Sequence, residues 1–264
     1  MDLQVNGPKV FFELPFDLPD SAIFTMKNLI TQTTVSIAAV TVILIALALI
    51  VSRKITKRPG KLQVVAEKLV SMLYGLVEDT MGKHNLKFAP YIGTIFLSSI
   101  IGTLIGTTQL FRSTTADLSV TAAWAIVTTG MVWYNNIKNF GFGTWLKGFT
   151  EPIVVMTPMN IVSEIANPVS MAFRHFGNVA GGSVLTALIY GALSAASSLL
   201  FSWLPGALSQ IPFLAAGIPA FLSIYFDLFS GFVQALVFSL LTMIYVGGAC
   251  PPPEELPVKK NEKQ

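Results

Sequence analysis

Four acidic or basic side chains stand alone in the long apolar stretch between Pro152 and Pro253: Glu164, Arg174, His175 and Asp227. A charge at the centre of a bilayer costs about 2.5 to 3.5 kcal/mol on insertion scales. A chain that keeps Arg174 in such a place therefore needs the guanidinium, either for an ion path or to neutralise a buried carboxylate. Four such groups are too few for a charged aqueous pore and too many for inert anchors.

The spacing of polar and small residues around Arg174 predicts a functional face on one helix. Positions three and four apart share a helix face, and this relation joins Glu164, Asn167, Met171, Arg174, Asn178 and Gly181. Asp227 and Gln234 are seven apart and share a face of the next apolar segment. His175 is rotated by about 100° from Arg174, so it fits a packing histidine better than a proton carrier.

Each of these residues also has a simpler interpretation. Arg174 and Asp227 can form an interhelical ion pair that locks the helices together, and Glu164 can lie at a solvated helix end. The amides of Asn178 and Gln234 can make interhelical hydrogen bonds, a common use of amides in membranes. The small residues permit close approach of another backbone: Gly177, Ala180, Gly181 and Gly182.

Composition sets these residues in an integral membrane protein. Hydrophobic residues make up 53% of the chain and charged residues 12%, whereas soluble domains carry roughly 25% charged residues. The sequence contains no Walker loop, no paired metal-ligand spacing and no Ser/His/Asp set. We therefore expect no catalytic, cofactor-binding or metal-binding site, and no nucleic-acid partner. The acidic N-terminus is the reverse of a secretory signal.

The apolar blocks predict an all-α fold with five transmembrane helices. Their ranges are 29–51, 88–111, 118–137, 158–204 and 212–249. The basic cluster from Arg53 to Lys61 follows the first block, which by the positive-inside rule makes that loop cytoplasmic. Segment 1–28 is then external and the tail 250–264 is cytoplasmic, so the orientation is N-out and C-in. We expect the whole chain to form a single membrane domain.

Two segments differ from an ordinary span. Blocks 158–204 and 212–249 are longer than the roughly 20 residues that a bilayer requires. We therefore expect each block to form one long tilted helix. The alternative is a helical hairpin in each block. Segment 62–83 alternates apolar and charged residues with helical periodicity. It predicts an amphipathic helix on the cytoplasmic membrane surface or against a soluble partner.

Three motifs resemble subunit a of the F-type ATP synthase. The run PVSMAFRHFGN at 168–178 resembles the family pattern P-[LV]-S-L-x-L-R-L-F-G-N. The run TADLSVT at 115–121 and the run FVQALVFSLLTMIY at 232–245 resemble the family's helix entry and its last helix. His175 departs from the family's usual leucine, and Ser183 and Asp227 occupy positions where members often carry glutamate or histidine.

The resemblance implies a stator ion channel with two offset half-channels beside a rotating c-ring. Arg174 would prevent an ion short-circuit, and Asn178 and Gly181 would face the rotor on the same side of the helix. Asp227 with Ser183 and Gln234 would line the entry, and Glu164 would mark the exit. The implied partners are the c-ring, the subunit b stalk, the remaining F1Fo subunits, membrane lipid and the transported H⁺ or Na⁺. The implied location is the bacterial inner membrane. A stand-alone secondary transporter or ion channel is the alternative, although no internal repeat is evident.

Overall fold

The computed structural model describes a mostly helical chain. The described residues are 10–13, 28–53, 55–57, 59–108, 111–151, 153–200 and 224–254. Strands β1 (Val10–Glu13) and β2 (Asn28–Thr31) form one irregular antiparallel pair. The all-α prediction did not include this pair, because two strands of four residues are too short to show a repeating sequence pattern.

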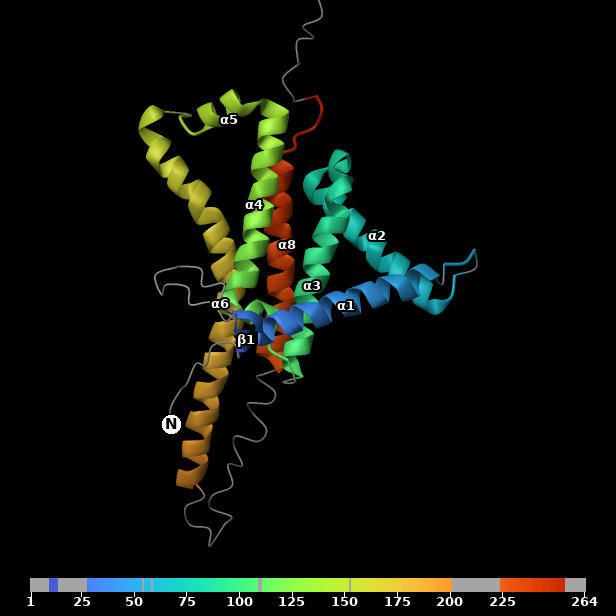
Figure 1. Ribbon diagram of the computed structural model, residues 1–264, viewed down its shortest axis with the longest axis vertical. Helices are drawn as coiled ribbons and strands as arrows, with labels where there is room; N and C mark the ends of the chain where they lie inside the picture. Colours follow the sequence, from blue (N-terminus) through green and yellow to red (C-terminus); the bar gives the residue numbers. More distant parts are fainter. Residues whose placement is uncertain are drawn as a thin grey trace, which may run out of the picture. The chain divides into compact units, whose positions relative to one another are not determined.

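Helices account for most of the other described residues (Figure 1). The α-helices are α1 (Gln32–Arg53), α2 (Lys61–Met81), α3 (Ala89–Thr107), α4 (Leu118–Phe140), α5 (Phe142–Gly148), α6 (Thr157–Leu200) and α8 (Gly231–Gly248). Three 3-10 helices and one π-helix lie between them: η1 (Lys83–Phe88), η2 (Thr114–Ala116), η3 (Val154–Met156) and the π-helix η5 (Ile224–Ser230). A helical membrane fold is thereby confirmed.

Four helical segments of the described chain are long and apolar enough to cross a membrane: Gln32–Arg53, Lys83–Thr107, Val154–Leu200 and Leu228–Gly248. The chain is therefore a multi-pass membrane protein. Helix α4, which the sequence predicts as a span, is not among the four. Its polar residues Thr121, Thr128 and Asn135 lower its hydropathy, and all three are buried inside the protein.

Helix α6 is one unbroken helix of 44 residues, drawn from yellow to orange in Figure 1. At 1.5 Å per residue it is about 66 Å long, well beyond the roughly 30 Å of a hydrocarbon core. The helical-hairpin alternative is wrong for this block. Residues 201–223 lie outside the described part, and with them the first third of the predicted block 212–249. The described remainder of that block is η5 followed directly by α8.

Helix α2 carries an exposed apolar stripe and a buried C-terminal end. Leu62, Val65, Leu69 and Met72 are exposed, whereas Val77 is fully buried. The helix ends at Gly82, whose φ of 81° lies in the left-handed region that glycine adopts most easily. The exposed stripe is consistent with an interfacial helix, whose place on the membrane surface stays a prediction.

The chain divides into two compact units, which are described separately. The first comprises Met1–Ile43, Ser98–Leu118 and Arg174–Ala235, and the second comprises Leu44–Leu97, Ser119–Phe173 and Leu236–Gln264.

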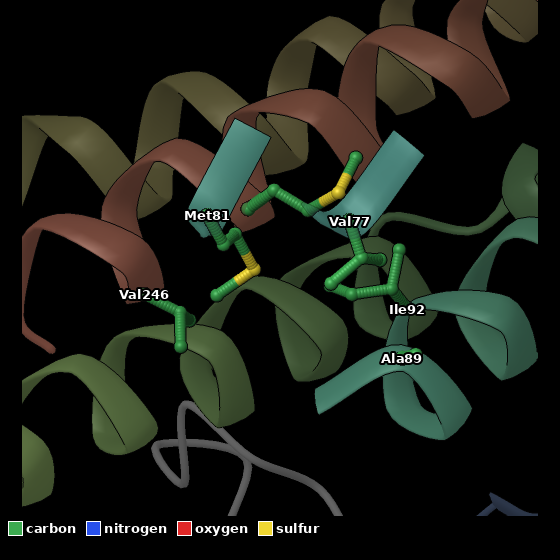
Figure 2. Packing of buried hydrophobic residues seen from close by; sticks show 6 residues of the cluster. Val77, Met81, Ala89, Ile92 and Val246 are labelled. Carbon is green, nitrogen blue, oxygen red and sulfur yellow. The ribbon is translucent and has the colours of Figure 1, made fainter. Parts of the chain in front are cut away.

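The second unit has a hydrophobic core where α2, α3 and α8 meet. Its six buried members are Val77, Met81, Ala89, Ile92, Met243 and Val246. Figure 2 shows Val77, Met81, Ala89, Ile92 and Val246 of this cluster. Polar side chains secure the end of α8 in the same unit, because Asn85 donates to the Cys250 carbonyl at 2.8 Å and Asn139 to the Ala249 carbonyl at 2.9 Å. These contacts hold the chain just after α8 against η1 and the end of α4.

The first unit brings the second half of α3 close to the start of α8. A Cβ atom at Gly231 would lie 2.6 Å from Thr103 Cγ2, so the two helices approach closely only because position 231 is glycine. The loop after α3 is packed just as closely, since a Cβ at Gly106 would lie 3.0 Å from the Ser113 Cα. This unit holds most of the residues that the sequence selects as a site.

Candidate functional site

Arg174 lies on α6 with its side chain exposed. No hydrogen bond or ion pair joins it to a side chain in the described part of the chain. The side chain of Asp227, its proposed ion-pair partner, lies outside that part. An exposed guanidinium on a long apolar helix offers a fixed positive charge, because arginine stays protonated in proteins.

His175, the next residue, is buried with 2% of its surface exposed. Its Nε2 lies 2.9 Å from the Ser99 Oγ of α3, and the backbone of Gln234 also interacts with the ring. The histidine therefore links α3, α6 and α8 from inside the first unit. This environment fits the packing role that its position beside Arg174 predicts.

Asn178 makes a defined contact within the first unit. The Ser230 Oγ, at the end of η5, donates a hydrogen bond to the Asn178 Oδ1 at 2.6 Å. Ser183 instead donates to the Ala180 carbonyl of its own helix at 2.8 Å, so its hydroxyl makes a local bond on an exposed surface. The structure thus joins Asn178 to the helix that carries Asp227 and Gln234.

The glycines beside Arg174 face open space. A Cβ atom at Gly177 or Gly181 would meet no described atom within 4 Å. The close backbone approach that these small residues permit is therefore not made by any described segment of this chain. The predicted face is also not uniform, because Met171 on the same stripe is buried with 2% exposed.

The two polar positions of the last segment differ from the predicted geometry. Asp227 lies in the π-helix η5, and its side chain is outside the described part. A π turn contains more residues than an α turn, so the seven-residue spacing to Gln234 does not keep the angular register of a regular α-helix. The Gln234 Nε2 is buried and has no hydrogen-bond partner among the described residues.

Glu164 lies in the second unit, near the start of α6. Its carboxylate accepts a hydrogen bond from the Trp133 indole of α4. Because Pro168 has no backbone N–H, the Glu164 carbonyl also lacks the usual donor four residues later. Glu164 lines a pocket of about 340 Å³ together with aromatic and amide side chains, so it is more than a solvated helix end.

Sequence reasoning missed the polar partners of these residues. Ser99, Ser230 and Trp133 each contact a predicted site residue from another helix. Serine in an apolar block is a weak signal, because small hydroxyl residues also support ordinary helix packing. Among the described residues, no group of three His, Cys, Asp or Glu side chains can hold a metal ion.

Comparison with known proteins gives one family. The model of the family described as "ATP synthase A chain" matches residues 34–247. The chain is 31% identical to "ATP synthase subunit a, sodium ion specific" of Propionigenium modestum over 279 residues, which cover 96% of this chain and 88% of that protein. It is 30% identical to ATP synthase subunit a of Bacillus subtilis over 232 residues, or 84% of this chain and 91% of that protein. The family model covers most of the chain and these relatives are similar over most of their length, so the chain belongs to the ATP synthase A chain family.

Proposed function

We propose that this chain is the stator ion-channel subunit of the Fo motor in an F-type ATP synthase. One observation carries the proposal: Arg174 is exposed on an apolar helix, and the adjacent Gly177 and Gly181 face open space. A cation on such a surface needs a partner outside this chain, and the small residues let that partner come close. A ring of c subunits that carry ionisable carboxylates meets both requirements.

The arginine acts by electrostatics. A rotor carboxylate crosses the apolar bilayer in its neutral form, either protonated or loaded with an ion. Near Arg174 the opposite charge favours the ionised carboxylate, which therefore releases its ion. Because the guanidinium repels a passing cation, Arg174 also prevents direct leakage between an entry path and an exit path.

The two half-channels use the remaining polar residues. Asp227 and Ser183 line the entry from outside, with Gln234 deeper and nearer Arg174, and Asn178 faces the rotor beside Arg174. The Ser230 to Asn178 hydrogen bond supports this grouping, since it ties η5 to α6. Glu164, ten positions before Arg174 on α6, serves the exit toward the cytoplasm. His175 holds the helices together rather than carrying the ion.

The membrane arrangement has five spans, with the N-terminus outside and the C-terminus inside. Helix α4 is the fifth span, although its hydropathy is low. Its polar residues face the protein, where Tyr91 Oη and Thr128 Oγ1 are 3.1 Å apart, and a span with buried polar residues need not be strongly apolar. The chain lies in a bacterial inner membrane with the c-ring, subunit b and the other F1Fo subunits, and it moves H⁺ or Na⁺.

Arg174→Ala tests the proposal in inverted vesicles that contain the whole complex. We expect ATP-driven ion pumping to disappear while ATP hydrolysis by the catalytic head persists. Ser170→Ala, at an exposed position one turn earlier, should pump normally. The amount of chain that copurifies with the c-ring controls for assembly. A fully assembled Arg174→Ala complex that pumps normally would show that the proposal is wrong.

A further inference from the structure

The pocket beside Glu164 has the size and composition of a small-ligand site. It is an open pocket lined by the end of α4, by α5 and by the start of α6, all within the second unit, and its volume is about 340 Å³. Ligand pockets typically measure about 300 to 1,000 Å³ and combine aromatic walls with a few polar groups. Here the aromatic walls are Phe140, Trp145 and Phe149, and the polar groups include Asn136, Asn160 and Glu164.

The electrostatics of the pocket favour a cation. Glu164 is the one ionisable side chain among the lining residues. One of its carboxylate oxygens accepts from the Trp133 indole, and no ion pair in the described part of the chain neutralises it. A carboxylate that no side chain neutralises attracts a positively charged ligand.

The aromatic walls suit a cation that carries apolar substituents. The Trp145 and Phe149 rings meet edge to face with centroids 5.2 Å apart, and the Trp133 ring lies 6.3 Å from Trp145. Ring faces attract ammonium groups, and an aromatic cage with a nearby carboxylate is well suited to substituted ammonium ions.

The walls are held in place by hydrogen bonds. The Asn160 Nδ2 donates to the Phe149 carbonyl at 2.9 Å and to the Glu151 carbonyl at 3.1 Å. These bonds tie the segment after α5 to the start of α6. The pocket is therefore built by the fold, and binding requires little reordering of its aromatic wall.

Other ligand classes fit less well. An anion would be repelled by Glu164, and a divalent metal would find a single carboxylate where it needs several oxygen ligands. A neutral apolar molecule would cover the Glu164 carboxylate without supplying an opposite charge. We propose that this pocket binds a substituted ammonium group, supplied either by a soluble amine or by the headgroup of an aminophospholipid.

Direct binding tests the site. The probe is radiolabelled benzyltrimethylammonium, measured by equilibrium dialysis against the whole complex in nanodiscs, with neopentylbenzene as its uncharged counterpart. We expect saturable binding of the ammonium and at least about tenfold weaker binding to Glu164→Gln, because a contact with a charged group is lost. Trp145→Leu should also weaken binding, whereas Glu151→Gln, an exposed carboxylate outside the lining, should leave it unchanged. Equal binding of the uncharged counterpart, or unchanged binding to Glu164→Gln, would overturn the proposal.

Lipid composition separates the two sources of the ammonium group. Weaker probe binding in phosphatidylethanolamine nanodiscs than in phosphatidylglycerol nanodiscs identifies a competing lipid headgroup, and equal binding identifies a soluble amine. A bound ammonium should also slow ion pumping by occupying Glu164, and this consequence alone rests on the proposed function. If Glu164→Gln loses binding yet pumps normally, the binding site stands and the exit role of Glu164 is wrong.

Discussion

Two neighbouring residues of α6 have opposite environments. Arg174 is exposed, and no described side chain forms a hydrogen bond or ion pair with it, whereas His175 is buried and its Nε2 lies 2.9 Å from the Ser99 Oγ. One residue turns an α-helix by about 100°. That single step separates an exposed side chain from a side chain that packs inside the chain.

The difference shows how a membrane helix can carry two polar groups for different purposes. The buried histidine contacts Ser99 and the backbone of Gln234 within the first unit. The open space at Gly177 and Gly181 leaves Arg174 available to another protein. Substitutions on the two faces should therefore affect different measurements: ion pumping for Arg174, and helix packing for its buried neighbours.

The largest effect should come from Arg174→Lys. We expect pumping to be abolished or nearly so even though the formal charge is kept. The lysine ammonium lacks the planar guanidinium group of arginine, which can donate two parallel hydrogen bonds to a carboxylate, and it can lose its proton in an apolar site. ATP-driven quenching of a pH or potential dye in inverted vesicles measures this, beside the amount of assembled complex. Full pumping by the lysine variant would mean that any cation suffices on this face.

Asp227→Asn should lower pumping by on the order of a hundredfold, as expected when a proton-transfer group is removed. The entry role predicts normal assembly and partial rescue by Ser183→Glu in the same chain. If Asp227 instead only neutralises Arg174, assembly should fall and Ser183→Glu should not help. Vesicle pumping normalised to assembled complex decides between these roles.

Met171→Ala should destabilise the packed face of α6. Met171 is 2% exposed and Phe173 is 53% exposed. Removing the buried side chain should cost about 2 kcal/mol, whereas Phe173→Ala should change stability much less. Thermal unfolding of the detergent-solubilised complex measures the difference. Equal losses for the two variants would contradict the assignment of packed and exposed faces.

The smallest effect should come from His175→Leu combined with Ser99→Ala. Replacing both partners of a buried hydrogen bond by apolar groups is nearly neutral, so pumping should stay within about twofold of the parent. His175→Leu alone should do worse, because it leaves the Ser99 hydroxyl buried without this partner. A large pumping loss in the double variant, at normal assembly, would place His175 in the ion path.

Residues whose role depends on their own chemistry, or on their spacing along a single helix, were predictable from the sequence. Arg174 is recognisable because a cation in an apolar stretch is costly, and the run at 168–178 is specific enough to indicate the family, which the match to residues 34–247 confirms. Strands β1 and β2 and the π-helix η5 were not predictable in this way. Their patterns are too short to separate from the surrounding sequence.

The amino-acid sequence by itself determined the membrane class, the helical fold and the set of candidate polar residues, since these follow from hydropathy, periodicity and local motifs. Only the tertiary structure decided which of those residues meet. The contacts of His175 with Ser99, Asn178 with Ser230 and Glu164 with Trp133 join residues 76, 52 and 31 positions apart. Such contacts depend on how whole helices pack against each other, and helix packing is set by many side chains together rather than by any local pattern.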